Sequence, residues 1–144
     1  MRVQFKQLTI PVFVLLLTAC ASGPKYSEVA SDFAALDPAQ GRIYIYRPSS
    51  FGAAVRPNVK LNGAVVGEAI SYGFFFVDRE PGEYTIMTST EVDRSLSLTL
   101  RAGQTRYVRL GISFGFLVGH VYPELVDNTV GEGEIRKLSY TGGR

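Results

Sequence analysis

Hydrophobic and polar positions alternate along most of the chain after residue 41. The clearest case is 95–100, where Leu96, Leu98 and Leu100 share one face and serine and threonine occupy the other, the period of two expected of a half-buried strand. Similar short runs occupy 42–47, 58–61, 64–68, 72–78, 83–90, 105–110, 112–122 and 135–138. The pattern predicts an all-β domain of seven or eight strands. Their regular spacing favours a single antiparallel β-sandwich, with a small barrel as the alternative.

Turn residues punctuate these runs and refine the prediction. Asn62-Gly63 separates two apolar runs and predicts a two-residue hairpin, because both residues tolerate the positive φ that such a turn requires. Three consecutive phenylalanines over 74–76 indicate a strand covered on both faces, and therefore a central one. Gly131-Glu132-Gly133 is interpreted as a turn before the last strand.

The segment before residue 41 has a different character. Gly23-Pro24 and Asp37-Pro38 are breakers, and between them Ser27 is a candidate cap for a short helix over 28–36. This helix would dock on the domain or cover a sheet edge; the alternative is a disordered spacer. In either case we expect 21–26 to be a flexible leash. The predicted organisation has three parts: a signal peptide over 1–19, a possibly helical tether over 20–40, and a β-domain over 41–144.

Residues 1–19 have the layout of a secretory signal peptide, with a positive start and an apolar run of ten residues over 8–17. This run is too short to cross a bilayer. The following Leu17-Thr18-Ala19-Cys20 resembles a bacterial lipobox. The resemblance implies that diacylglycerol is attached to the sulfur of Cys20, the chain is cut before it and its new amine is acylated. The alternatives are an ordinary signal peptide and a short membrane anchor.

Ala21 follows the lipobox cysteine. In the lipoproteins that the motif resembles, aspartate at this position retains the protein in the inner membrane. The resemblance therefore implies anchoring at the periplasmic face of the outer membrane. Two or more acyl chains would make the attachment stable.

Charge and composition argue against several classes of binding partner. The chain has 144 residues, with 15 basic and 13 acidic side chains, and two of the basic ones, Arg2 and Lys6, lie in the leader. The rest is neutral on a formal count, whereas nucleic acid binding relies on clustered surplus Lys and Arg. One histidine and one cysteine do not make up the three or four ligands of a zinc site. We expect no nucleic acid partner, no metal and no cofactor beyond the covalent lipid.

The search for catalytic groups also returns little. Nucleophilic catalysis needs a nucleophile, a base and an orienting group, and His120 lies in an apolar run typical of a packed histidine. The acidic pairs lie at turns or strand ends, where charges are usually solvated: Asp78 with Glu80, Glu91 with Asp93, and Glu132 with Glu134. We expect no catalytic residues and no enzymatic activity.

Tyrosines provide the candidate binding face. Tyr44 and Tyr46 alternate with two isoleucines that already supply an inward face, and Tyr107 and Arg109 extend the same surface. Exposed aromatic side chains can stack on sugars or on partner proteins. The alternative is that the tyrosines fill the second face of the sandwich, or that they lie beneath the helix over 28–36.

Several segments in order also resemble a known family. They are Val59-Lys60-Leu61-Asn62-Gly63, Gly73-Phe74-Phe75-Phe76-Val77-Asp78, Pro81-Gly82-Glu83-Tyr84 and Ala102-Gly103-Gln104-Thr105. Their order resembles the domain-of-unknown-function 2846 family of small bacterial lipoproteins over 41–139 and, more loosely, prealbumin-like or PEGA-like sandwich modules. The resemblance implies a fold but no activity, and 49–57 and 111–119 match nothing in it.

Together these observations predict a lipid-anchored cell-envelope protein that acts as a non-enzymatic binding or structural module. The membrane is its partner through the lipid on Cys20, and an envelope protein or glycan is the expected ligand. Two alternatives stay open at this point: a small envelope hydrolase, and an antagonist or immunity-type lipoprotein.

Overall fold

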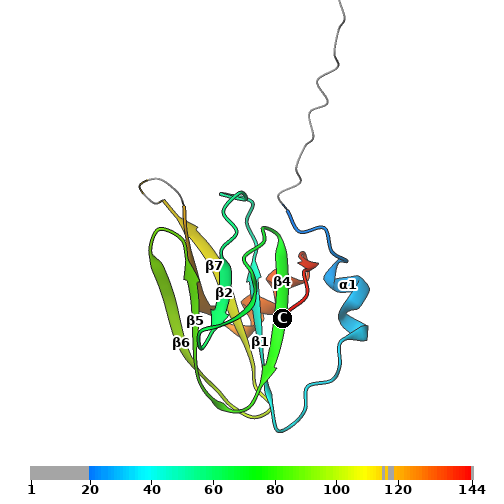
Figure 1. Ribbon diagram of the computed structural model, residues 1–144. Helices are drawn as coiled ribbons and strands as arrows, with labels where there is room; N and C mark the ends of the chain where they lie inside the picture. The colour runs from blue at the N-terminus through cyan, green and yellow to red at the C-terminus, as the bar shows by residue number, and fades with distance from the viewer. Residues whose placement is uncertain (1–19, 115, 117–118, 144) are drawn as a thin grey trace, which may run out of the picture.

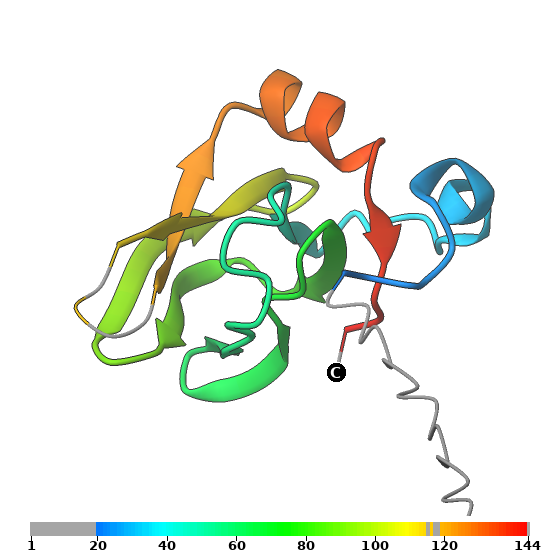
Figure 2. The same cartoon turned by 90° about the horizontal axis from the view of Figure 1, so that it is seen from above.

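The computed structural model describes residues 20–114, 116 and 119–143, so the predicted signal peptide lies outside the described residues. Two β-sheets pack face to face, and helices lie against the outer face of one of them (Figure 1, Figure 2). The elements in chain order are α1 (Tyr26–Val29), the 3-10 turn η1 (Ala30–Asp32), β1 (Gly41–Arg47), β2 (Asn58–Leu61), β3 (Ala64–Glu68), β4 (Gly73–Arg79), β5 (Gly82–Ser89), β6 (Asp93–Leu100), β7 (Thr105–Ser113), β8 (His120–Val126), α2 (Asn128–Ile135) and β9 (Ser139–Tyr140). The mostly-β prediction is confirmed.

The strand pairing departs from a purely antiparallel sandwich. One sheet has the order β8-β7-β1-β4-β9 and the other β3-β2-β5-β6. β1 runs parallel to β7, and β4 runs parallel to β9, so the antiparallel prediction is wrong for these two pairs. Neither pair is joined by a hairpin, because the chain reaches β7 from the other sheet and β9 from α2. The direction of these strands is therefore set by tertiary packing.

The main core lies between the sheets and follows the predicted alternation. Leu98 and Leu100 of β6 are buried there, and the intervening Ser97 and Thr99 are exposed. Asn62 and Gly63 both have positive φ, 48° and 87°, and join β2 to β3 as predicted. Both faces of β4 are covered, as its phenylalanines indicated. Its predicted central position is wrong: β1 is the middle strand, and β4 lies next to the two-residue edge strand β9, which pairs with β4 only at Gly73 and Phe74.

A second core lies on the other face of the five-stranded sheet. Its buried members are Tyr44, Tyr46, Phe74, Tyr107, Ile135 and Leu138. The last two belong to α2 and the turn after it, which the sequence analysis interpreted as a turn over 131–133 and a strand over 135–138. That interpretation is wrong. Asp127 caps α2 by accepting a hydrogen bond from the Thr129 amide at 2.9 Å. Gly131 is required because a Cβ there would overlap the Tyr107 ring.

The segment before β1 is attached to the sheet. The Ala21 amide donates to the Ser71 carbonyl at 2.8 Å, and the Tyr140 amide donates to the Pro24 carbonyl at 2.8 Å. Residues 20–25 thus run beside β9 and supply partners for an edge that would otherwise have unpaired backbone groups. The predicted flexible leash over 21–26 is therefore wrong, because its backbone is paired to the domain.

The predicted helix is shorter and begins earlier than expected. It follows Lys25, not Ser27, and helical structure ends at Asp32, not at Leu36. The chain becomes extended at Phe33, whose ring packs at 4.9 Å from Phe76. The partly buried ring packs against the second core at the point where helical structure ends.

Arg42 fastens the next part of the segment to the sheet. Its guanidinium donates to both carboxylate oxygens of Asp78, at 2.7 and 2.8 Å, and to the Ala34 carbonyl at 2.9 Å. It also lies 4.1 Å from the centre of the Phe76 ring. One buried side chain therefore links β1, β4 and the chain that follows η1.

Candidate functional site

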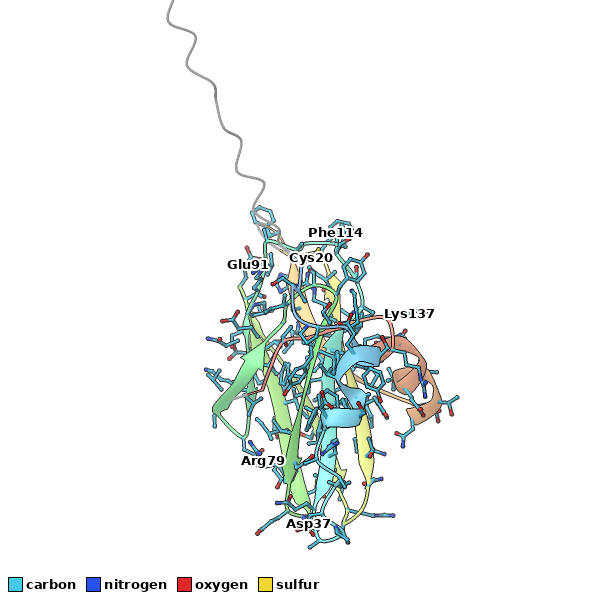
Figure 3. All side chains as sticks on the ribbon, turned by 90° about the vertical axis from the view of Figure 1, so that its right-hand side faces the viewer. Cys20, Asp37, Arg79, Glu91, Phe114 and Lys137 are labelled. Atoms are coloured by element: carbon cyan, nitrogen blue, oxygen red, sulfur yellow. The ribbon has the colours of Figure 1, made fainter. Side chains whose placement is uncertain are left out.

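Cys20 lies at one end of the sandwich and is exposed. It forms a parallel bridge with Ser71, which directly precedes the exposed Tyr72. Figure 3 shows Cys20, Glu91 and Phe114 at this end, with Asp37 and Arg79 at the opposite end. We call the end with Cys20 the anchor end.

A hollow of about 330 Å³ adjoins Cys20. It is lined by residues 20–23, Arg56, Ile70, Tyr140 and Thr141. Arg56 is exposed, so a basic side chain lies beside the sulfur that the lipobox resemblance marks for modification. A group attached to that sulfur would enter a partly polar surface and not a closed core.

The loop after β1 forms another part of the anchor end, and Arg47 holds it. Only 1% of Arg47 is exposed. Its guanidinium donates to the carbonyls of Phe51, Gly52, Val55 and Ala69 at 2.6–2.9 Å. Burial, reinforced by nearby Arg56, lowers the pKa of Arg47. Both Nη atoms of the buried cation are satisfied by backbone carbonyls, and these bonds fix the shape of the loop. The Nε of Arg47 is buried without a hydrogen-bond partner among the described residues.

Aromatic side chains project from the anchor end. Phe51 is 51% exposed, Phe114 88% and Phe116 96%. The Phe51 and Phe114 rings meet edge to face with centroids 5.3 Å apart, which joins the loop after β1 to the connection between β7 and β8. Sequence reasoning did not single these residues out. The available signal was the lack of any charged residue in 48–55 and 111–119.

The predicted tyrosine face is not exposed. Tyr44 and Tyr107 are each 7% exposed and Tyr46 is 1% exposed. They are covered by α2 and by residues 26–33, which we call the α1 segment. Tyr44 and Tyr107 stack in parallel at 5.2 Å, as expected from their pairing across β1 and β7. The alternative left open by the sequence, a filled second face, describes this arrangement.

Arg109 lies at the margin of this core in a small polar cluster. It donates to Glu134 at 3.0 Å and to Glu124 at 3.2 Å. Tyr46 donates to the other oxygen of Glu134 at 2.5 Å. Burial and this bond to Glu134 raise the pKa of Tyr46. The cluster joins α2 to β1, β7 and β8, so these polar groups act as links between elements.

The candidate catalytic groups are paired individually. His120 is 8% exposed, and its Nε2 lies 3.1 Å from a Glu91 carboxylate oxygen. In the acidic pairs, Asp78 binds Arg42, Asp93 accepts from Ser89, and Glu132 pairs with Arg136. Each predicted pair thus has at least one carboxylate engaged with a basic or hydroxyl group.

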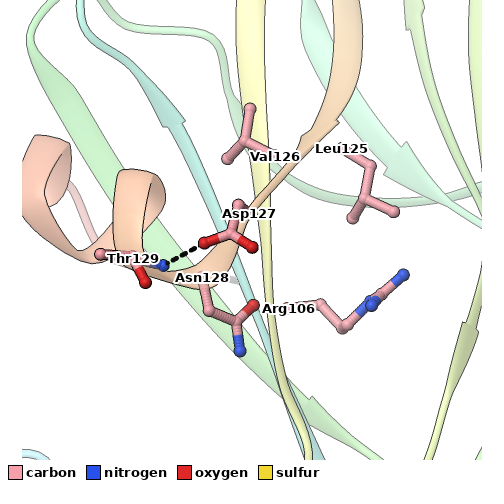
Figure 4. Close-up of a pocket in the computed structure, with 6 residues that line it drawn as sticks. All are labelled: Arg106, Leu125, Val126, Asp127, Asn128 and Thr129. Atoms are coloured by element: carbon pink, nitrogen blue, oxygen red, sulfur yellow. Dashed lines mark hydrogen bonds between the residues drawn. The ribbon is translucent and has the colours of Figure 1, made fainter.

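Another hollow, of about 570 Å³, lies beside the start of α2 and is lined by Arg106 and residues 125–129 (Figure 4). The carboxylate in its lining, that of Asp127, caps α2 by accepting from the Thr129 amide, and it therefore already has a structural role. Within the described residues, no group of histidine, cysteine, aspartate or glutamate side chains is arranged to hold a metal ion. The helices of residues 20–114, 116 and 119–143 are also too short and polar to cross a membrane.

Comparison with known proteins identifies the domain. The family described as "Protein of unknown function (DUF2846)" has a sequence model that matches residues 37–121. The chain belongs to this family. The matched region of domain of unknown function 2846 spans β1 to β7 and the start of β8. The α1 segment, α2 and β9, which cover the second core, lie outside it.

A relative of this protein occurs in Haemophilus influenzae. It is 30% identical over 140 residues, which cover 94% of this chain and 83% of the relative, and it is described as an uncharacterized protein. No solved structure matches the chain. Membership of domain of unknown function 2846 therefore supports the domain identity and brings no activity with it.

Proposed function

We propose that this protein is a lipid-anchored component of the bacterial cell envelope, with diacylglycerol on the sulfur of Cys20 and an acyl group on its amine. The observation that carries the proposal is the placement of Cys20: it is exposed at the anchor end and is the last residue of the lipobox-like sequence. An exposed sulfur at a domain end is accessible to a modifying enzyme and leaves the fold undisturbed.

The β-domain acts as a non-enzymatic binding or structural module for an envelope protein or glycan. The ion pairs and hydrogen bonds of its candidate catalytic groups support this role, because a general acid or base must be available to substrate. The tyrosines are replaced as candidates for the contact, since a ligand cannot reach side chains that α2 and the α1 segment cover.

The first experiment tests the anchor. The full chain and its Cys20→Ala variant are expressed in a Gram-negative host, and the intact mass and membrane fractionation of each are compared. Wild type should carry the lipid mass and sediment with membranes, whereas the variant should lack both properties. Ser22→Ala is the matched control, because it changes a neighbouring exposed residue and keeps the cysteine. A Cys20→Ala variant that is processed and membrane-bound like wild type would contradict the proposal.

A second variant tests the membrane. Ala21→Asp places an aspartate after the lipidated cysteine, the residue that retains similar lipoproteins in the inner membrane. The wild type should therefore band with the outer membrane on a density gradient and Ala21→Asp with the inner membrane. Identical banding of the two proteins would remove the outer-membrane part of the proposal.

A further inference from the structure

We propose that the anchor end inserts aromatic side chains into the lipid interface, so that Phe51, Phe114 and Phe116 lie in the membrane beside the acyl chains on Cys20. The inference rests on the proposed lipidation of Cys20. It goes further, because it assigns the membrane a direct contact with the β-domain and gives the domain a fixed orientation.

A continuous series of contacts joins Cys20 to the aromatic residues. The residue after Cys20 is bonded to Ser71. Tyr72 follows Ser71, and its hydroxyl lies 3.5 Å from the hydroxyl of Ser50. Ser50 directly precedes Phe51. The Phe51 ring contacts Phe114. The lipid-bearing residue and the phenylalanines therefore belong to one surface.

Exposed apolar side chains are concentrated on that surface. Phe51, Tyr72, Phe114 and Phe116 are between 41% and 96% exposed. The large exposed apolar side chains placed away from it include Val65 and Val130, at 37% and 46%. Contiguous patches of exposed apolar side chains mark interaction sites, whereas exposed apolar side chains that are scattered singly are normal.

Charge supports lipid as the occupant. Residues 48–55 and the described residues 111–114, 116 and 119 include no aspartate, glutamate, lysine or arginine, so their side chains can enter the interface without desolvating an ion. Phenylalanine and tyrosine suit the boundary between headgroups and acyl chains. A protein partner would not need this neutrality at the point where the chain is anchored.

The geometry of the anchor brings the surface to the bilayer. Cys20 is bridged to Ser71, so no slack chain separates the lipidated residue from the domain. Arg47 holds the carbonyls of Phe51 and Gly52, so Phe51 extends from a fixed loop. Acyl chains that enter the membrane from Cys20 therefore carry the aromatic residues to its surface.

The experiment exploits the absence of tryptophan from the chain. Phe114→Trp supplies a single reporter in the full lipidated protein, and Phe51→Trp supplies a second one on the other segment. Each protein is reconstituted in vesicles of phosphatidylethanolamine and phosphatidylglycerol, with or without brominated acyl chains. Val130→Trp is the matched control, because Val130 is exposed on α2. Circular dichroism verifies the fold of each variant.

Tryptophan at 114 or 51 should be quenched by brominated lipid and protected from aqueous iodide, and tryptophan at 130 should behave in the opposite way. Iodide quenching at 114 and 51 in lipidated, vesicle-bound protein would overturn the insertion and leave the anchor intact. Protection that rises with protein concentration at fixed lipid would assign the surface to a second copy and also overturn it. An intact mass without lipid on Cys20 would overturn the proposed function and the inference together.

Discussion

Replacing Arg47 with methionine removes the buried guanidinium that shapes the anchor end. Methionine keeps a long apolar side chain, so the change acts mainly on the four hydrogen bonds to backbone carbonyls. The Ala69 carbonyl lies in a buried environment, whereas those of Phe51, Gly52 and Val55 are only partly buried. Water can therefore replace the guanidinium at three sites and not at the fourth.

The expected loss of stability follows from the difference between the buried Ala69 carbonyl and the three partly buried carbonyls. An unsatisfied buried carbonyl costs about 1–3 kcal/mol, and each carbonyl that exchanges a charged donor for water loses about 1 kcal/mol. Removing the buried charge offsets part of this loss, because the described residues include no carboxylate paired with Arg47. We expect Arg47→Met to lower the free energy of unfolding by about 3 kcal/mol, which corresponds to roughly 10–15 °C in Tm for a domain of this size.

The assay is urea and thermal unfolding followed by circular dichroism, together with limited proteolysis of 49–57. Arg47→Lys should lose nearly as much stability, because one ammonium group cannot reach carbonyls that the two guanidinium nitrogens serve. Arg101→Met, at an exposed position, should change the unfolding free energy by less than about 0.5 kcal/mol. If Arg47→Met unfolds as wild type does and its loop is no more sensitive to protease, the account of the anchor end is wrong.

Three further predictions concern the second core. Gly131→Ala should destabilise the protein by about 2 kcal/mol, because its Cβ overlaps Tyr107. In the same denaturant titration Gly133→Ala, whose Cβ meets nothing within 4 Å, should be neutral or stabilising by about 0.5 kcal/mol. Equal effects of the two substitutions would contradict the close approach of α2 to Tyr107. Burial raises the pKa of Tyr107 from 10.0 to about 12, so the folded state keeps a proton that the unfolded chain loses, and stability should fall between these pH values by about 1.4 kcal/mol per pH unit. Tyr107→Phe should reduce that slope by the Tyr107 contribution in unfolding curves measured across the range, while Tyr44 and Tyr46, whose pKa values are also raised, keep theirs. An unchanged slope would refute the assignment. Arg42→Lys should lose the bidentate bond to Asp78 and lower stability by about 1–2 kcal/mol, and a fully stable variant in thermal unfolding would refute the role given to that bond.

Local patterns predicted the strands that local physics controls. The leucines of β6 and the Asn62-Gly63 turn could be assigned because alternation and positive φ are properties of neighbouring residues. The parallel pairing of β1 with β7 could not, since it depends on how the chain crosses between sheets. Strand content was therefore predictable and strand direction was not.

The error at the tyrosines has one physical cause. Two glycines lower the helix propensity of 128–135 by about 1 kcal/mol each, so the sequence favoured a turn where Gly131 in fact permits close packing of α2. Without that helix, the short helix predicted over 28–36 is the only cover that the sequence offers Tyr44 and Tyr46 on their side of β1. The prediction that the tyrosines are exposed therefore failed for the same reason as the prediction of a turn in place of α2.

The bridge between Cys20 and Ser71 limits how far an anchored domain can reach. β7 runs from Thr105 to Ser113, and nine residues of strand extend about 30 Å. With the proposed lipid on Cys20, the opposite end near Asp37 and Arg79 (Figure 3) would stand about that far above the bilayer. A domain anchored in this way would search by lateral diffusion within a thin layer next to the membrane. The proposed ligand would itself have to enter that layer, because the Cys20–Ser71 bridge leaves no slack chain between the lipid and the domain.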